Sequence, residues 1–242
     1  GGCLATEEAA APGFRSNTHA NIILPWYYGP VWRDFPEFWD YGAQIDQYLC
    51  SSGSIFANNQ TCIVIYSDKH DPSQERTARE IARFSERDAE KWLGLAALER
   101  SNEYQRVQID NLFNPAEFKL SPDILNRQME IYPKLVEAGF EPDSLILSTN
   151  QMHAVRETWE SQEMQYNVLR FVLSGAIDVG DPGNGVEAMG MAATLPTISF
   201  ARGGTHQIAH AAHQILVQMG CKFFTHSEVD KVIIENGAAT AI

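Results

Sequence analysis

Residues 202–242 read RGGTHQIAHAAHQILVQMGCKFFTHSEVDKVIIENGAATAI and hold the clearest structural signals in the chain. The pair Gly203-Gly204 predicts a turn into a helix, and Gly220 predicts the end of that helix. The apolar residues between them recur at helical spacing and form one stripe: Ile208, Ala212, Ile215, Leu216 and Met219.

Strands are predicted after this helix. Residues 221–225 have the composition of a strand, and Asn236-Gly237 is the strongest two-residue hairpin signal, between strands at 229–235 and 238–242. A further hairpin is predicted at residues 53–67, where Asn58 and Asn59 tolerate the positive φ of a tight turn.

Helices are predicted through the middle of the chain. Thr77-x-x-Glu80 and Ser85-x-x-Asp88 have the spacing of a helix N-terminus, where a hydroxyl caps free N–H groups. Ser121-Pro122 predicts another start, and Pro133 is expected to kink or break that helix before Gly139 ends it. Residues 151–173 are compatible with a helix throughout. Helices mixed with hairpins indicate an α+β fold.

The composition narrows the function classes. The chain has 242 residues and a net charge of −13, which disfavours nucleic acid and anionic lipid as partners. It contains no apolar run long enough for a transmembrane helix and no secretory signal in its first residues. The cysteines, Cys3, Cys50, Cys62 and Cys221, form no CxxC pair, so we expect reduced thiols and a cytoplasmic location.

Two motifs suggest sites only weakly. Gly183-x-Gly185-x-x-Ala188 matches a relaxed dinucleotide fingerprint, but Asp181 and Pro182 crowd the turn, and a glycine-rich surface loop is the favoured interpretation. The residues His206, His210 and His213 share one helical face and could ligate zinc. That helix offers no carboxylate or thiol to complete the site, so we predict a polar face without metal.

Aromatic residues concentrate between positions 26 and 48. The nine are Trp26, Tyr27, Tyr28, Trp32, Phe35, Phe38, Trp39, Tyr41 and Tyr48. They could line a cleft for an apolar ligand, pack in the hydrophobic core, or form a surface that a part of the polypeptide outside residues 1–242 covers. No GxSxG, HExxH or Walker motif is present, so classical hydrolase, zinc-protease and kinase functions have no support.

Several stretches, in order along most of the chain, resemble the phytoene-desaturase-like family of FAD-dependent oxidoreductases. They are Gly1-Gly2-x-x-x-Thr6-Glu7-Glu8 with Pro12-Gly13-Phe14-Arg15, Glu75-x-Thr77-x-x-Glu80-Ile81, Trp159-Glu160-Ser161-Gln162-Glu163, Ala201-Arg202-Gly203-Gly204-Thr205, and the stretch from Gly220 to Gly237. Ala201 stands where the family usually has proline. The family's Rossmann fingerprint and its C-terminal flavin motif would lie outside residues 1–242, so we expect a central segment of a longer polypeptide.

The resemblance implies a domain organisation and a set of site residues. Residues 1–25 and 196–242 would be strips of a Rossmann-like FAD domain, and residues 26–195 an inserted substrate domain of sheet plus helices. The flavin would lie against Gly1, Gly2, Thr6 and Val229, and the substrate against Trp26, Tyr27, Tyr28 and Trp32. His19 is a weak candidate for a proton shuttle, with a packed loop histidine as the alternative.

The implied activity is desaturation of an apolar substrate such as an isoprenoid, by hydride transfer to FAD. The pyrophosphate cradle would come from the rest of the polypeptide or from a second chain, so this segment alone is not expected to hold FAD. An unpaired strand at 238–242 would favour association into homo-oligomers. The alternative is a non-catalytic binding or assembly subunit that keeps only the substrate-domain fold.

Overall fold

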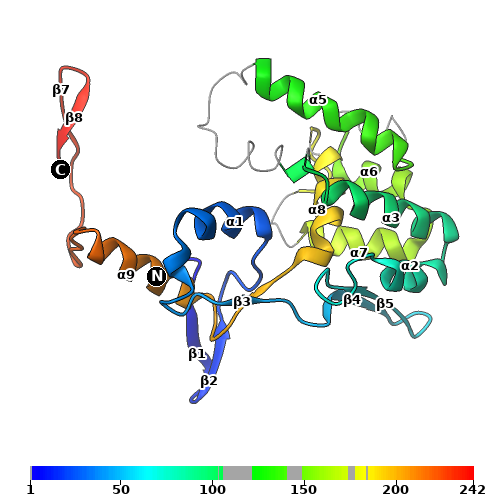
Figure 1. Cartoon of the computed structure of the whole chain (residues 1–242), viewed down its shortest axis with the longest axis horizontal. Helices are drawn as coiled ribbons and strands as arrows, with labels where there is room; N and C mark the ends of the chain where they lie inside the picture. Colours follow the sequence, from blue (N-terminus) through cyan, green and yellow to red (C-terminus); the bar gives the residue numbers. More distant parts are fainter. Residues whose placement is uncertain (1, 103, 106–121, 141–148, 174–177, 184) are drawn as a thin grey trace.

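The chain is described by a computed structural model over residues 2–102, 104–105, 122–140, 149–173, 178–183 and 185–242. Helices combine there with small antiparallel sheets, so the predicted mixed α+β class is confirmed. Figure 1 shows a helical body on one side and, on the other, a smaller part that contains both ends of the chain.

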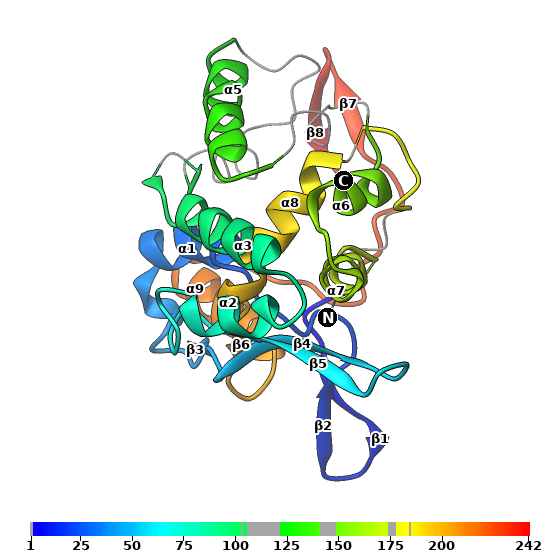
Figure 2. The same cartoon turned by 90° about the vertical axis from the view of Figure 1, so that its right-hand side faces the viewer.

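A two-stranded hairpin, β4 (Cys50–Phe56) and β5 (Thr61–Tyr66), lies at one edge of the helical body. The sequence predicts this hairpin, although the positive φ of its turn falls on Gln60 (53°) and not on the two asparagines. The helices of the body, seen from two sides in Figures 1 and 2, are α2 (Glu75–Ala82), α3 (Glu86–Glu99), α5 (Pro122–Glu137), α6 (Gln151–Thr158), α7 (Gln162–Leu173) and α8 (Gly185–Thr194), followed by the short η3 (Leu195–Thr197).

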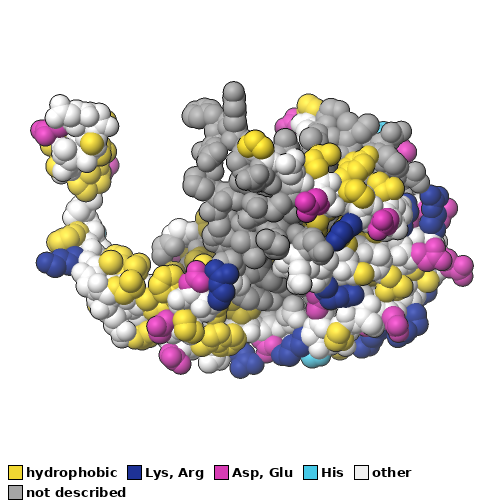
Figure 3. All heavy atoms as spheres, turned by 45° about the horizontal axis from the view of Figure 1, so that its top comes forward, with side chains coloured by type: hydrophobic (Ala, Val, Ile, Leu, Met, Phe, Trp, Pro, Cys, Tyr) yellow, Lys and Arg dark blue, Asp and Glu magenta, His cyan; other side chains and the backbone are white. Residues whose placement is uncertain are grey.

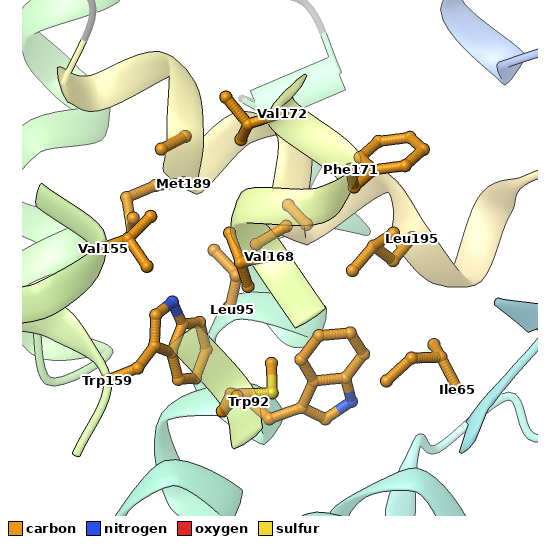
Figure 4. Packing of buried hydrophobic residues seen from close by; sticks show 14 of the residues in the cluster. Ile65, Trp92, Leu95, Val155, Trp159, Val168, Phe171, Val172, Met189 and Leu195 are labelled. Atoms are coloured by element: carbon orange, nitrogen blue, oxygen red, sulfur yellow. The ribbon is translucent and has the colours of Figure 1, made fainter. Parts of the chain in front are cut away.

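A large hydrophobic core fills this body. Side chains from β5, α3, α7 and α8 converge in it (Figure 4), and Ile65, Trp92, Val168 and Met189 are each at most 1% exposed. Ile63 and Ile65 lie two residues apart on β5 and are both fully buried, as the alternation of a strand requires. Burial of these apolar side chains is the main stabilising contribution to the body.

The smaller part is formed by the N-terminal segment together with the residues after position 196. Antiparallel pairing of β3 (Ile45–Asp46) with β6 (Phe200–Ala201) and a single bridge between Ile23 and Ser199 connect the two segments. A second, smaller core lies here, made of Phe38, Ala43, Ala211 and Ile215. The elements are β1 (Thr6–Ala11), β2 (Phe14–Asn17), α1 (Pro25–Asp34), η1 (Pro36–Phe38), β3 (Ile45–Asp46), β6 (Phe200–Ala201) and α9 (His206–Gln218).

The chain ends in a hairpin, β7 (Ile233–Glu235) and β8 (Ala238–Ala241), that stands apart from the rest (Figure 1). Asn236 and Gly237 have φ of 54° and 79°, which confirms the predicted tight turn. The strand predicted at 221–225 is wrong, and Val229 lies outside β7. No other strand among the described residues runs beside this segment, and an extended chain forms a strand only where a neighbour pairs with its backbone.

One predicted helix start is wrong and the other is confirmed. Helix α2 begins at Glu75, so Thr77 lies inside it; the Asp71 carboxylate accepts the N–H groups of Arg76 (3.3 Å) and Thr77 (3.0 Å) instead. At the start of α3, the Ser85 hydroxyl accepts the N–H of Asp88 at 3.1 Å, as the motif predicts.

Two further expectations about helices are corrected. Residues 151–173 form two helices, α6 and α7, with a break at 159–161. Pro133 lies inside α5, which runs on to Glu137. The carbonyl that loses its partner there belongs to Met129, which is exposed, so water can replace the missing N–H. Gly139 (φ 90°) follows the end of the helix as predicted.

Candidate functional site

The two segments that the resemblance assigns to one FAD domain meet at the start of α9. Asn17 Oδ1 accepts a hydrogen bond from Thr6 Oγ1 (2.8 Å) and another from the N–H of Thr205 (3.1 Å). Thr6 Oγ1 in turn accepts the N–H of His206 at 3.1 Å. Thr205 provides no side-chain cap of its own. Side chains from β1 and β2, which are far from α9 in the sequence, therefore cap the start of this helix.

The glycine turn makes this contact possible. Gly204 has φ of 97°, and a Cβ there would lie 2.3 Å from Thr6 Oγ1. Only a residue without a side chain fits this position. The turn predicted from Gly203-Gly204 is thus confirmed, and its role is close packing between the two segments.

The aromatic segment between positions 26 and 48 is divided between core and surface. Phe38 is buried against α9, and the Trp32 ring packs on it with centroids 4.6 Å apart. Trp32 Nε1 also donates to the carbonyl of Ala43 at 3.1 Å. Phe35, Trp39 and Tyr48 are exposed. Trp26, Tyr27 and Tyr28 lie on α1, but their side chains are outside the described part, so their role as substrate contacts stays a prediction.

A shallow, open pocket of about 280 Å³ lies beside this segment. Trp39, Ile45 and Asp46 line it from the aromatic side, and Lys69 and Ser199 from the other. Tyr48 packs against Phe200 of β6 nearby, with ring centroids 5.1 Å apart. The pocket therefore offers an aromatic ring and charged groups side by side, over a surface more open than a cleft that encloses a ligand.

The Asp46 carboxylate forms the electrostatic centre of this pocket. It accepts hydrogen bonds from Arg202 Nη2 (2.7 Å), from Lys69 Nζ and from the N–H of Gln47 (2.9 Å). The hydrogen bond from Arg202, then that from Lys69, lowers the pKa of Asp46 well below its usual range. The ion pairs link β3, the turn after β6 and the loop after β5. Sequence analysis missed this centre because its members are 23 and 156 residues from Asp46.

The weak catalytic candidate lies at the edge of the N-terminal hairpin. His19 is exposed, and its Nε2 lies 3.9 Å from the Cys3 sulfur. A backbone hydrogen bond from Ala20 to Cys3 (3.0 Å) holds the two residues side by side. His19 is outside the pocket lining, and its role as a proton shuttle stays a prediction.

The predicted flavin contacts are not brought together as a pyrophosphate cradle. Gly1 is outside the described residues, Gly2 is exposed in a turn, and Val229 is 55% exposed after α9. The hydroxyl of Thr6 is already used as a cap. Because Thr6 and Asn17 occupy the first N–H groups of α9, that helix start is not available to a phosphate.

The backbone N–H groups of the glycine motif at residues 183–188 are also hydrogen-bonded within the protein. The N–H groups of Gly183 and Gly185 both donate to the carbonyl of Thr149, at 3.2 and 2.8 Å. A Cβ on Gly185 would lie 2.9 Å from that carbonyl oxygen, so the glycine permits a close backbone contact. Neither this turn nor the start of α9 therefore offers free N–H groups to the pyrophosphate of a dinucleotide.

The histidine face of α9 is present as predicted. The rings of His206 and His210 are stacked with centroids 6.5 Å apart, and His213 packs edge-on against Phe223 at 4.4 Å. Within the described ranges, no three His, Cys, Asp or Glu side chains are grouped closely enough to hold a metal ion.

We expect the purified chain to contain no stoichiometric zinc. Among the described residues, two stacked imidazoles without a third His, Cys, Asp or Glu beside them form a weak site, and the His213 ring is engaged by Phe223. Elemental analysis after dialysis measures this. His210→Ala should leave the metal content unchanged. One zinc per chain that disappears in this variant would contradict the prediction.

In the described part of the chain, no helix has both the length and the apolar character needed to cross a membrane. No protein-family model matches the chain. Over 253 aligned residues it is 23% identical to one of the subunits of limonene dehydrogenase from Castellaniella defragrans, an alignment that covers all of this chain and 41% of that protein. The chain is therefore similar, along its whole length, to less than half of a dehydrogenase subunit.

Proposed function

We propose that this chain is part of an FAD-dependent oxidoreductase that desaturates an apolar, isoprenoid-like substrate. The observation that carries the proposal is the similarity of the whole chain to 41% of a dehydrogenase subunit whose name contains an apolar terpene, limonene. The family resemblance of the sequence supports the same chemistry. Bound FAD would supply the hydride acceptor, and this chain would contribute substrate positioning and exclusion of water.

The pocket beside the aromatic segment is the proposed place of substrate contact. Trp39 and Ile45 offer apolar surface there, and α1, with Trp26, Tyr27, Tyr28 and Trp32, belongs to the same part of the molecule. The Asp46 ion pairs with Arg202 and Lys69 fix the pocket wall. Their role in this proposal is positioning.

The dinucleotide cradle is proposed to come from the rest of the polypeptide or from a second chain. Two observations support this division. The N–H groups of Gly183 and Gly185 and those of Thr205 and His206 at the start of α9 are occupied by protein acceptors. In addition, apolar side chains are exposed along the arm from α9 to the β7–β8 hairpin (Figure 3), including Leu216, Val217, Met219, Phe223 and Phe224. Such an uncovered apolar surface is typical of an interface.

The alternative function is a binding or assembly subunit without catalysis. The occupied N–H groups support this alternative as much as they support the oxidoreductase, because a chain that does not hold FAD itself can also lack a redox role. The two functions differ in whether adding the dinucleotide-binding unit creates an active flavoprotein.

We predict that residues 1–242 alone carry no stoichiometric flavin, and that adding the missing unit restores it. Expression alone and together with the dinucleotide-binding unit, followed by gel filtration, gives the absorbance near 450 nm for each sample. The combined sample should be yellow and should oxidise a cyclic monoterpene with an artificial electron acceptor. The separate chain should be colourless and prone to association through its exposed arm.

Two results separate the hypotheses. A combined sample that binds FAD but oxidises no apolar substrate would favour the assembly subunit. A yellow, monodisperse monomer of the separate chain would contradict the division of the cofactor site. As a control, Trp39→Ala in the combined sample should lower the rate of substrate oxidation while leaving the flavin content unchanged.

A further inference from the structure

The pocket beside the aromatic segment carries a surplus of positive charge. Asp46 is the acidic side chain among its lining residues, and Lys69 lines the same pocket. Lys69 Nζ donates to Asp46 Oδ1, and Arg202 Nη2 donates to Asp46 Oδ2 at 2.7 Å. Two cations therefore share one carboxylate, and one positive charge of the group is left without a counter-charge. This occurs in a chain whose net charge is −13.

Both cations keep N–H donors that a ligand can use. The side chains of Lys69 and Arg202 are 51% and 63% exposed, whereas that of Asp46 is 24% exposed. An ammonium has three N–H donors and a guanidinium has five. Within the described ranges, the acceptor for each of these two side chains is Asp46. Most of their donors are therefore directed toward solvent and not into the protein.

The acidic residues that flank Lys69 in the sequence do not supply the missing negative charge. Asp68 accepts a hydrogen bond from Gln74 Nε2 at 3.2 Å and lies 3.9 Å from Arg100 Nη1. Asp71 accepts the N–H of Thr77 at 3.0 Å. Neither carboxylate is among the lining residues of the pocket. The surplus charge is therefore a property of the pocket itself.

Backbone hydrogen bonds hold the two cationic segments in place before any ligand binds. The N–H of Arg202 donates to the carbonyl of Gln44 at 2.8 Å. The N–H of Lys69 donates to Gln47 Oε1 at 3.0 Å. Gln44 and Gln47 flank β3, so both cations are anchored to the strand that carries Asp46. Groups that are already ordered lose less conformational freedom when they bind a ligand.

The remaining wall of the pocket offers apolar surface. Trp39 lines it and is 47% exposed, and the half-buried Ile45 lies beside it. The volume of about 280 Å³ is at the lower end for a ligand pocket, which favours a small ligand. An apolar wall next to a single surplus positive charge matches a small apolar molecule with one negatively charged end.

We propose that this pocket binds small apolar compounds that carry one carboxylate group. The apolar body lies against Trp39 and Ile45, and the carboxylate accepts hydrogen bonds from Lys69 and Arg202. A phosphate ester carries up to two negative charges at neutral pH, which exceeds the single surplus charge. The inference rests on the proposed function only in taking this pocket as the place of substrate contact. Within that substrate class, neutral terpenes would touch the same apolar wall and bind more weakly.

Binding of three matched probes to the full chain of 242 residues tests the proposal without flavin. The probes are cyclohexanecarboxylate, the neutral cyclohexanecarboxamide and cyclohexyl phosphate, at pH 7. Chemical shifts of the backbone amides of Gln47, Lys69 and Arg202 give each dissociation constant. The carboxylate should bind at least about fivefold more tightly than the carboxamide, which is the effect of one unit charge at about 4 Å in water. It should also bind more tightly than the phosphate ester.

Charge variants distinguish an anion site from ion pairs that only hold segments together. Lys69→Gln and Arg202→Gln should each weaken carboxylate binding about fivefold. Asp46→Asn should strengthen it by a similar factor, because both cations then lose their internal counter-charge. Arg83→Gln is the matched control and should leave binding unchanged. The Arg83–Glu80 ion pair is also 2.7 Å long, with Arg83 49% exposed, and it lies on α2.

The sign of the Asp46→Asn effect decides between the two roles. If the ion pairs served only to position the pocket wall, removing Asp46 would weaken binding as the other two variants do. Exposed ion pairs contribute little to stability, so these variants should fold, and their amide spectra check this. Weaker binding in Asp46→Asn, equal affinity for carboxylate and carboxamide, or tighter binding of cyclohexyl phosphate would each overturn the proposal.

The two proposals about this pocket can fail separately. Carboxylate binding with the expected variant effects, in a chain whose combined sample oxidises no terpene, would support the carboxylate site and count against the redox function. Oxidation of a neutral terpene by the combined sample, together with equal affinity of the pocket for carboxylate and carboxamide, would overturn the carboxylate site alone.

Discussion

Replacing Asp88 by alanine is expected to lower the free energy of unfolding by about 3–5 kcal/mol. Asp88 is fully buried, and its carboxylate accepts three hydrogen bonds from the break between α6 and α7. The donors are the N–H of Glu160 (2.8 Å), the N–H of Ser161 (2.8 Å) and the hydroxyl of Ser161 (2.6 Å). Alanine would leave all three without an acceptor, two of them on the buried Ser161. Urea denaturation followed by tryptophan fluorescence measures the loss.

Two further variants give this prediction its control. Glu90→Ala, at an exposed position of the same helix, should change the free energy of unfolding by less than about 0.5 kcal/mol. Asp88→Asn keeps one acceptor oxygen but points an N–H toward other N–H groups, so it should fall between the two. If Asp88→Ala were no more harmful than Glu90→Ala, the carboxylate would not be what holds α6 and α7 in place.

The same residue shows how far the sequence could predict the fold. The spacing of Ser85 and Asp88 correctly predicts the start of α3. Both side chains also contact residues far away in the sequence. Ser85 Oγ donates to Glu160 Oε2 at 2.6 Å, and the Asp88 carboxylate accepts the N–H of Ser161. These contacts end α6 and begin α7 within residues whose local pattern is helical throughout. A break imposed by a partner more than 70 residues away leaves no periodic signal.

The candidate site was predictable only in part, for a related reason. The glycine turn at 203–204 and the aromatic segment were visible because each is local. The Asp46 ion pairs were not, since they depend on which distant segments the fold brings together. The family resemblance implies that Thr6 contacts flavin. In the structure, the Thr6 hydroxyl caps α9. A hydroxyl used as a cap can still border a ligand, so its contact with flavin stays a prediction.

The largest local effect is expected at Gly204. In Gly204→Ala, the new Cβ would meet Thr6 at Oγ1 (2.3 Å), Cγ2 (2.4 Å) and Cβ (2.8 Å). Rotation of the threonine side chain cannot relieve the contact with its Cβ, so the N-terminal hairpin must move away from α9. The hydrogen bonds of Thr6 to His206 and of Asn17 to Thr205 would break with it. We expect amide protection at Thr205 and His206 to fall by at least about a hundredfold, equivalent to about 3 kcal/mol.

Gly203→Ala is the matched control. Gly203 has a positive φ of 76°, so alanine meets a similar backbone strain there, about 1 kcal/mol. The nearest atom to its added Cβ is Gln207 Cγ at 3.5 Å, an ordinary contact. The difference between the two variants therefore isolates the collision with Thr6 from the strain of the turn.

Thr6→Gly in the Gly204→Ala background completes a double-mutant cycle. It removes the atoms that collide but also removes the hydroxyl cap, so it should restore part of the protection and no more. A positive coupling between the two sites would show that the N-terminal and C-terminal segments are joined at this contact. Independent effects would mean that the hairpin reaches its place through other contacts, such as the bridge between Ile23 and Ser199. If the segments border a common cofactor, as proposed, Gly204→Ala should also reduce flavin retention in the combined sample far more than Gly203→Ala does.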